Sequence, residues 1–406
     1  MYLQQKEFIL LLNYKILHHI NNYDALEVQG MANTNLQQAK QAKNDEFYTQ
    51  WADIEKEIYA YIDFNPDVFK DKTILLPCDD PEWSNFTKFF AQNFENFGLK
   101  KLISTSFAFE SKKINIPYQT SLFEQKAPQF DPDINKIKGK LFILDHDTNK
   151  NGVIDIDDLE WKYLEGDGDF RSDEVKKLRD EADMIITNPP FSLFREFLNW
   201  IIEADKKFVI IGNMNAITYK EVFPLIKNNQ IWLGDGFNHG NAYFKPLGNN
   251  REYADGVYNE KEQLVKFRNC VWFTNLDHGR RHKPLQLMTM ADNIKHSKHK
   301  EIRGIGYKKY DNYDAIEVPY TDSIPSDYEG VMGVPVSFLD KYCPEQFEII
   351  GMAKRGAGDP ALKTKVYTKQ DYSNYSDLNA GPVLIRQDGS LYNTYPRILI
   401  RKKTID

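Results

Sequence analysis

The chain has little cysteine: only Cys78, Cys270 and Cys343 occur in 406 residues, far apart and with no CxxC pair. This scarcity argues against a disulfide framework and a zinc ribbon, and it fits a reducing cytoplasm. No apolar run approaches the roughly 20 residues that a membrane-spanning helix needs. We therefore expect a cytoplasmic protein without a membrane partner, and its length favours more than one domain.

An excess of positive charge is also missing, since the net charge is −7. The charges are nevertheless unevenly distributed. Residues 142–183 hold 14 acidic against 6 basic residues, whereas residues 278–310 hold 9 basic against 2 acidic residues and four of the eight histidines. A basic run is often only a solvated face, so this segment permits a polyanionic partner without requiring one.

Short apolar runs alternate with amphipathic segments after residue 53. This alternation predicts βαβ units and a doubly wound α/β fold with a mostly parallel, Rossmann-like sheet. After about residue 215 the pattern fades, and we expect an irregular α+β region there. The predicted strands are 73–78, 100–107, 140–145, 183–187 and 207–212, and the predicted helices are 54–62, 84–98 and 193–206.

The tetrapeptide Asn188-Pro189-Pro190-Phe191 directly follows a predicted buried strand. One interpretation is a rigid turn that ends the strand, because proline stops strand pairing. The other is a site for a planar amino group. The Asn188 side-chain oxygen and the Pro189 carbonyl would hold its N–H bonds and leave the nitrogen lone pair aimed at an electrophile, while Phe191 stacks on the ring.

A second motif, over residues 147–158, has the spacing of a calcium-binding loop. Its oxygen ligands would come from Asp147, Asn149, Asn151, the Val153 carbonyl, Asp155 and Asp158, with Gly152 at the sharp turn. The apolar run before it predicts a strand, so the motif is at most half an EF-hand. The alternative is an Asn/Asp-rich turn that binds its own backbone.

Several segments together resemble the EcoRI-type adenine-specific DNA methyltransferases. They are NDEFYT (44–49), LLPCDDPEWSNF (75–86), LEGDGDFRS (164–172), ITNPPFSLFREF (186–197), IIGNMNAITYKE (210–221) and VPYTDSIPSDYEGVMGVPVSFLDKY (318–342). The resemblance covers most of residues 31–350. It implies methyl transfer from S-adenosylmethionine to N6 of a flipped adenine in duplex DNA, with Asn188, Pro189, Pro190 and Phe191 as catalytic residues.

The resemblance also assigns cofactor contacts. Phe47, Tyr48 and Thr49 would pack on the methionine end, although Gln50 stands where many relatives have proline. Cys78, Asp79 and Asp80 would bind the cofactor, with the two carboxylates meeting the ammonium of its methionyl group. The alternative for this segment is a helix N-cap by Asp80, followed by Pro81. Asp169 and Phe170 would bind the cofactor adenine, by hydrogen bonding and stacking respectively, although GDGDF alone is typical of a turn.

We expect the chain to divide into three parts, the first because Met31 opens a new polar stretch. They are an N-terminal extension (1–30), an S-adenosylmethionine-dependent catalytic domain (31–225) and a DNA-recognition and C-terminal region (226–406). A duplex-modifying enzyme must neutralise phosphates. We therefore expect the basic segment to bind DNA through Arg280, Arg281, Lys283, Lys295, Lys298, Lys300 and Arg303, with Lys308 and Lys309 as further candidates.

Other functions remain open from the sequence alone. The same pair of carbonyl oxygens would suit an RNA base or a protein glutamine amide. A DNA-binding protein with an inactive site and a calcium-binding interaction module are the non-enzymatic alternatives. A cognate restriction endonuclease would be a genetic partner of a modification enzyme.

Overall fold

The computed structural model describes residues 47–77, 79–80, 84–108, 127–237, 241–246, 256–356 and 362–403. The predicted N-terminal extension (1–30) and Cys78 lie outside the described residues. In the part of the chain that is described, no helix is long and apolar enough to cross a membrane.

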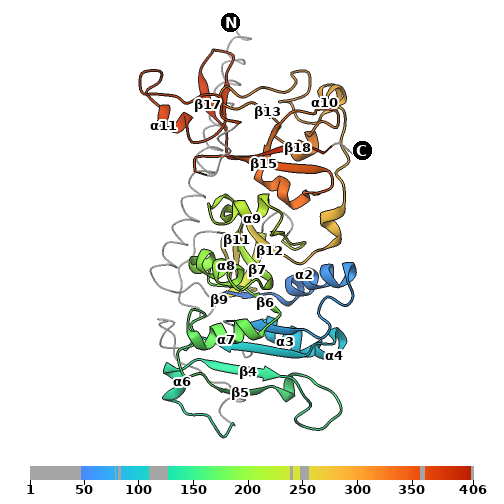
Figure 1. Ribbon diagram of the computed structural model, residues 1–406, viewed down its shortest axis with the longest axis vertical. Coiled ribbons are helices and arrows are strands. Elements are labelled where there is room, and N and C mark those ends of the chain that lie inside the picture. The colour runs from blue at the N-terminus through green and yellow to red at the C-terminus, as the bar shows by residue number, and fades with distance from the viewer. Residues whose placement is uncertain are drawn as a thin grey trace.

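An eight-stranded mixed sheet forms the centre of the described structure (Figure 1). Its strand order is β5 (Glu160–Tyr163), β4 (Lys140–Leu144), β3 (Lys101–Ser106), β2 (Thr73–Leu76), β6 (Met184–Thr187), β7 (Lys207–Asn213), β12 (Cys270–Thr274) and β8 (Trp232–Leu233). The four central strands, β3, β2, β6 and β7, are parallel. All five predicted strands are confirmed.

The prediction of a mostly parallel sheet is wrong at both edges of the sheet, because β4, β5, β12 and β8 join it by antiparallel pairing. The reason is that a short apolar run shows that a strand is buried but does not show its direction. Figure 1 shows β4 and β5 at one end of the molecule and the C-terminal strands at the other.

Helices cover both faces of this sheet, because successive strand residues point to opposite sides. Ile74 and Leu76 pack with α2 (Trp51–Phe64), α3 (Asn85–Gln92) and α4 (Phe94–Phe97). Leu75 and Ile185 belong to the second core, with α7 (Asp173–Glu181), α8 (Phe194–Ile202) and α9 (Phe223–Lys227). The predicted helix 84–98 is thus two helices, α3 and α4, and ends as expected at Gly98 in the left-handed conformation.

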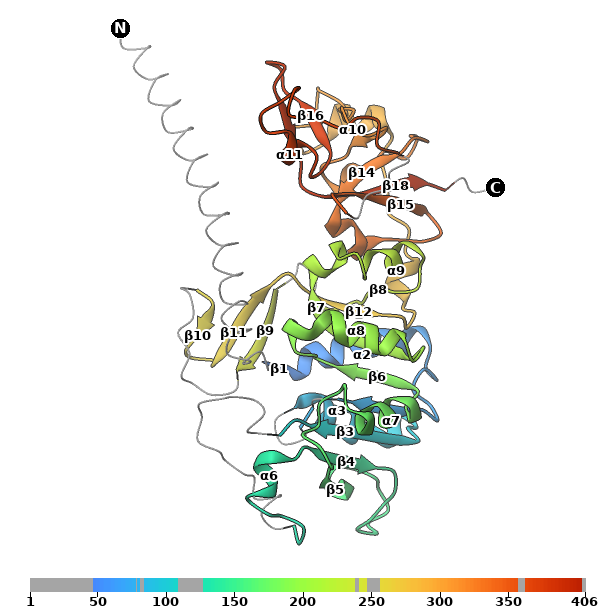
Figure 2. The ribbon, with the colours of Figure 1, turned by 60° about the vertical axis from the view of Figure 1, so that its left-hand side comes forward.

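Two further four-stranded sheets flank the centre. One is antiparallel, with the order β1 (Phe47–Thr49), β9 (Asn241–Pro246), β11 (Leu264–Arg268) and β10 (Tyr258–Asn259), and Figure 2 shows it projecting from the side of the molecule. The other is C-terminal, with the order β13 (Ile316–Glu317), β14 (Met332–Pro335), β18 (Arg397–Lys402) and β15 (Phe347–Ala353). The remaining α-helices and strands among the described residues are α6 (Ile134–Ile137), α10 (Met290–His296), α11 (Tyr375–Leu378) and the hairpin of β16 (Val383–Ile385) and β17 (Leu391–Asn393).

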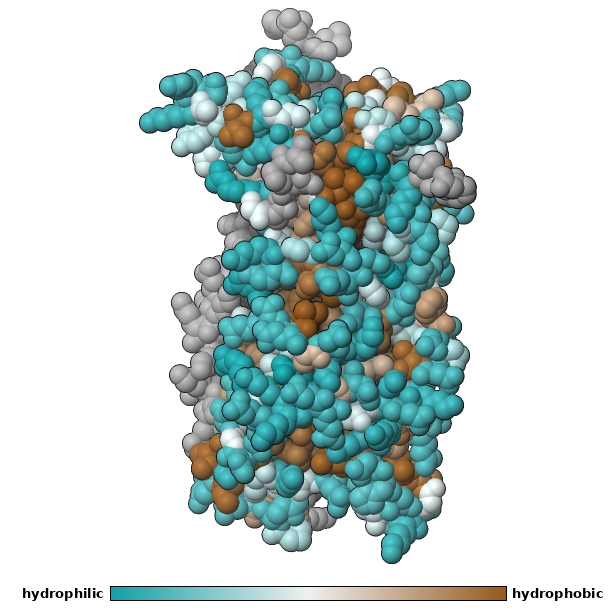
Figure 3. Space-filling view, viewed as in Figure 1, coloured by the Kyte–Doolittle hydropathy of each residue, from teal (hydrophilic) through white to brown (hydrophobic). Residues whose placement is uncertain are grey.

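The central sheet continues past residue 225, where we expected the catalytic domain to end, because β8 and β12 are two of its strands. The C-terminal sheet also shares a core with it, since Phe338, Phe347 and Ile400 belong to the same buried cluster as Leu75. Apolar side chains reach the surface between the C-terminal strands and α9, on a face that is otherwise largely polar (Figure 3).

Candidate active site

The Asn188 turn lies at the carboxyl end of β6, beside the end of β2. Pro189 is buried, whereas Asn188 and Pro190 are partly exposed. The Asn188 amide donates a hydrogen bond of 2.7 Å from Nδ2 to the Phe47 carbonyl oxygen. Because a carbonyl can only accept, this contact fixes Nδ2 on that side and directs Oδ1 the other way. Oδ1 is buried and has no hydrogen-bond partner among the described residues.

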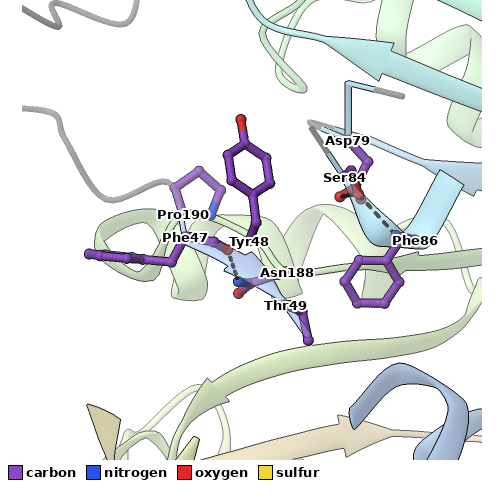
Figure 4. Close-up of a pocket in the computed structure, with 8 residues that line it drawn as sticks. All are labelled: Phe47, Tyr48, Thr49, Asp79, Ser84, Phe86, Asn188 and Pro190. Carbon is purple, nitrogen blue, oxygen red and sulfur yellow. Dashed lines mark hydrogen bonds between the residues drawn. The ribbon is translucent and has the colours of Figure 1, made fainter. Parts of the chain in front are cut away.

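Three segments that are distant in the sequence line one pocket (Figure 4). They are strand β1, the segment after β2 and the turn after β6, and their lining residues are Phe47, Tyr48, Thr49, Asp79, Ser84, Phe86, Asn188 and Pro190. The predicted cofactor and catalytic motifs are therefore adjacent. Thr49, another lining residue, also has a buried oxygen, Oγ1, without a hydrogen-bond partner among the described residues.

Strand β1 reaches the pocket through long-range pairing. Phe47, Tyr48 and Thr49 pair with Pro246, Lys245 and Phe244 of β9, about 200 residues later in the chain. Asn85 Nδ2 of α3 also donates to the Thr49 carbonyl oxygen at 2.7 Å. These contacts hold the FYT segment rigidly beside Asn188.

Asp79 is a buried carboxylate held by hydroxyl groups. It accepts hydrogen bonds from Ser84 Oγ at 2.6 Å and from Thr187 Oγ1. The Thr87 hydroxyl donates to the Asp79 backbone carbonyl at 3.0 Å. The segment is thus tied to both α3 and β6, which fixes the carboxylate in the pocket wall.

Asp80 is not the N-cap of α3, and Pro81, the other residue of the N-cap alternative, lies outside the described residues. Ser84 is the N-cap, because its Oγ accepts from the Phe86 N–H at 3.1 Å. Asp80 instead pairs with Lys140, the first residue of β4, at 3.5 Å, and both side chains are almost fully buried. The antiparallel direction of β4 places this lysine next to the carboxyl end of β3.

The GDGD loop packs its backbone against the end of β3. Ala108 N–H donates to the Asp167 carbonyl at 2.7 Å. Gly168 has a φ of +85°, and a Cβ there would lie 2.3 Å from the Ser106 carbonyl oxygen. Only glycine fits this approach. The close contact brings the loop to the strand edge where Asp79 and Asp80 lie.

Asp169 and Phe170, the predicted cofactor-adenine pair, have different environments. The Asp169 carboxylate pairs with Arg171, at 2.6 Å from Nη2. Phe170 is only 3% exposed and packs edge-on against Phe197 and Trp200 of α8, at ring-centre distances of 5.0 and 5.6 Å. Neither residue lines the pocket that contains Asn188.

Phe191 stands in an aromatic cluster beside the pocket. Its ring centre is 6.3 Å from Phe47 and 5.6 Å from Phe267, and Phe244 completes the group at 6.1 Å. The ring remains partly exposed. The cluster joins the turn after β6 to the sheet that contains β1, β9 and β11.

Comparison with known proteins shows the family to which the chain belongs. A family described as "Adenine-specific methyltransferase EcoRI" matches residues 35–403, which is most of the chain. The chain belongs to this family. It is therefore an adenine-specific DNA methyltransferase, which uses S-adenosylmethionine and acts on duplex DNA. No solved structure matches the chain.

Three relatives are named type II methyltransferases. M.EcoRI of Escherichia coli is 43% identical over 321 residues, which are 79% of this chain and 89% of the relative. M.MpnI of Mycoplasma pneumoniae is 33% identical over 341 residues (83% and 91%). M.MgeORF184P of Mycoplasma genitalium is 32% identical over 378 residues (90% and 98%).

The calcium-like loop of this methyltransferase connects β4 to β5, so the predicted strand before it is confirmed. Its side-chain oxygens bind the loop's own amides: Asp147 accepts from Gly152 N–H at 2.8 Å, and Asp158 accepts from Thr148 N–H at 2.9 Å and Asn149 N–H at 3.1 Å. No group of three or more His, Cys, Asp or Glu side chains suited to a metal occurs within the described residues.

The basic segment divides into structural and exposed residues. Arg281 is 7% exposed, lies 3.8 Å above the Trp232 ring and pairs with Asp277. Arg280 donates to the carbonyls of Gly234 and Asp235. These two arginines therefore hold the edge of the central sheet. Exposed side chains are those of Lys283, Lys295, Lys298, Lys300 and Arg303.

Sequence reasoning missed the groups that support the motifs. Thr187, Thr87 and Lys140 were not identified, although they hold Asp79 and Asp80. Ser84 carried a usable signal, since a serine directly before an amphipathic run is a typical N-cap. Lys140 carried none, because its role depends on the direction of β4.

Proposed function

We propose that this methyltransferase binds a flipped adenine with its exocyclic N6 between Asn188 Oδ1 and the Pro189 carbonyl oxygen. The observation that carries the proposal is the buried Oδ1, which lacks a described partner while Nδ2 is anchored on Phe47. A buried acceptor left unpaired costs about 1–3 kcal/mol. An N–H donor from a bound base would remove this cost.

The two acceptors act by orienting the amine. Each takes one N6–H bond, so the nitrogen lone pair turns out of the ring plane and points across the pocket. S-adenosylmethionine supplies a methyl group activated by a sulfonium. The two oxygens would stabilise the positive charge that develops on N6 as it accepts the methyl group. The proton that N6 then loses would pass to solvent water, so no strong base is required.

The residues for the cofactor are those that share the pocket with Asn188. Asp79 complements the ammonium of the methionyl group, Tyr48 and Thr49 enclose the methionine end, and Asp80 supports Asp79 through its pair with Lys140. The donor set fits because a buried carboxylate in the wall of the pocket complements a cationic group. Asp169 would bind the cofactor adenine once its carboxylate has exchanged the contact with Arg171 for one with the adenine.

Aromatic residues have two roles in the proposal. Phe191 stacks on the flipped adenine from its partly exposed position next to Pro190. Phe170 supports the loop from within the core, because its burial against Phe197 and Trp200 leaves no face for a purine. The exposed basic residues Lys283, Lys295, Lys298, Lys300 and Arg303 bind DNA phosphates.

We also propose that the enzyme protects DNA in a restriction–modification system, since its relatives are named type II methyltransferases. Sequencing of plasmid DNA for modified adenines, with and without this gene, tests the role. Modification of one short sequence, together with resistance to an endonuclease that cuts there, is expected. Absence of modified adenine would overturn it.

A substrate competition separates DNA from the alternative acceptors. Duplex DNA, structured RNA and a glutamine-containing peptide are offered together with methyl-labelled S-adenosylmethionine. The proposal expects label in DNA, at N6 of adenine. Label mainly in RNA or peptide would instead assign the acceptor pair to another substrate.

For the loop at 147–158, the contacts favour a turn satisfied by its own amides over a calcium site. Chelator-treated protein should therefore show the same melting temperature before and after calcium is added. A rise in melting temperature with one equivalent of bound calcium would establish the metal site.

A further inference from the structure

A second and larger groove lies in the C-terminal part of the chain. One wall is the segment after α10, with Ile302, Ile305 and Lys308; the opposite wall is the β16–β17 hairpin and the chain that follows it, up to Arg397. Figures 1 and 2 both show the hairpin strands and α10 within the same C-terminal lobe. The groove is thus separate from the pocket at Asn188.

The groove exposes apolar side chains that a monomer would normally bury. Ile305, Ile385 and Tyr395 are 66%, 49% and 76% exposed, and all three line it. Large apolar groups that gather in one groove mark a surface for a partner.

Cations lie among these apolar groups. Lys308, Lys354 and Arg386 line the groove. Of the two carboxylates in its lining, Glu317 is neutralised by Arg397 at 2.7 Å and Glu301 is exposed. The Arg386 guanidinium lies 4.3 Å above the Tyr392 ring, which holds it in position. The exposed Lys300 and Arg303 belong to the same wall segment. This combination of cations and apolar groups complements duplex DNA, whose phosphates are anionic and whose major groove presents polar base edges and the thymine methyl group.

The groove is connected to the edge of the central sheet at which Asn188 lies. Lys354 donates from Nζ to Thr218 Oγ1 at 2.8 Å. Thr218 ends the short helix η4 (Met214–Thr218), which directly follows β7. Since β7 is parallel to β6, its end lies at the same edge as Asn188. A duplex in the groove therefore borders the loops around the active site.

We propose that the β16–β17 hairpin reads the DNA sequence, with Arg386 and Gln387 at its turn contacting base edges and Tyr395 packing beside them. A two-stranded antiparallel ribbon fits a major groove. Both Arg and Gln make bidentate contacts with bases, to guanine and adenine respectively. This inference rests on the proposed action on duplex DNA and adds the element that selects the site.

The test maps modified adenines in plasmid DNA from cells that express full-length wild type, Arg386→Ala, Arg386→Lys, Gln387→Ala or Tyr395→Ala. Loss of a base contact should lower the ratio of methylation at the wild-type sequence to that at one-base variants about tenfold or more. Arg386→Lys is decisive because lysine keeps the charge but loses the bidentate geometry. It should relax the sequence without weakening total DNA binding.

Arg401→Ala is the matched control, because it removes the same exposed charge from β18 outside the groove. It should leave the modified sequence and its methylation level unchanged. Unchanged S-adenosylmethionine binding and melting temperature show that the hairpin variants fold.

The inference is overturned if every hairpin variant methylates the wild-type sequence with wild-type discrimination. It is also overturned if only Arg386→Ala lowers binding, does so equally for all sequences, and Arg386→Lys restores that binding. This result would show that Arg386 contacts a phosphate and not a base. In both cases wild-type adenine methylation persists, so the proposed function stands. Absence of methylation by the wild type would instead refute the proposed function.

Discussion

At the scale of single residues, the site depends on how buried polar atoms are paired. Asn188 is anchored through its amide nitrogen and keeps its oxygen for a ligand, whereas the Asp79 carboxylate is held by two hydroxyl groups. One donor contact thus prevents rotation of the Asn188 amide. In the proposed mechanism, the fold sets the position of this acceptor oxygen before the base arrives, which is what makes such a group effective.

Glu57 predicts a dependence of stability on pH. It is fully buried on α2, accepts hydrogen bonds from Tyr61 and Gly236, and burial raises its pKa to about 7. The folded protein therefore binds this proton more tightly than the unfolded chain does. Relative to Glu57→Gln, the wild type should lose stability as the pH rises from about 4.5 to about 7, and no further above it.

Urea unfolding at several pH values measures this difference. Glu55→Gln, an exposed carboxylate on the same helix, is the control and should follow the wild type at every pH. Parallel stability curves for wild type and Glu57→Gln over this range would contradict the account.

At the scale of elements, the loop before Asp169 depends on one glycine. Gly168→Ala would place a Cβ against the Ser106 carbonyl and force a positive φ on alanine, a conformation that costs about 1–2 kcal/mol by itself. The loop must move away from β3. We expect a lower melting temperature and weaker S-adenosylmethionine binding, measured by thermal scans and calorimetry.

Gly166→Ala is the matched control, since a Cβ there meets nothing within 4 Å. It lies two residues earlier in the same loop and should leave both quantities near the wild-type values. Equal behaviour of the two variants would show that the loop does not need the close approach.

The same scale shows how far the sequence could predict the structure. Buried strands such as β2 and β6 were predictable because continuous apolar runs specify burial, and the NPPF turn followed from its place after β6. The direction of β4 was not predictable, since both faces of an antiparallel inner strand can be buried. The pairing of β1 with β9 was not predictable either, because it joins residues about 200 positions apart. Burial of Phe170 and Arg281 likewise depends on neighbours supplied by other elements.

At the scale of the whole molecule, the central sheet and the C-terminal sheet share one core. We therefore predict a single cooperative unfolding transition, because neither sheet can lose its packing while the other remains intact. Calorimetry should give equal calorimetric and van't Hoff enthalpies. Two separated transitions would show that the C-terminal region folds independently.

The central claim concerns the acceptor pair at Asn188 and is tested by transfer of labelled methyl groups to duplex DNA. Asn188→Ala removes one acceptor, and kcat should fall by roughly 10²- to 10³-fold. S-adenosylmethionine binding, measured by calorimetry, should remain near the wild-type value. Asn199→Ala, an exposed asparagine on α8, should leave both unchanged. Near-wild-type turnover by Asn188→Ala would contradict the account.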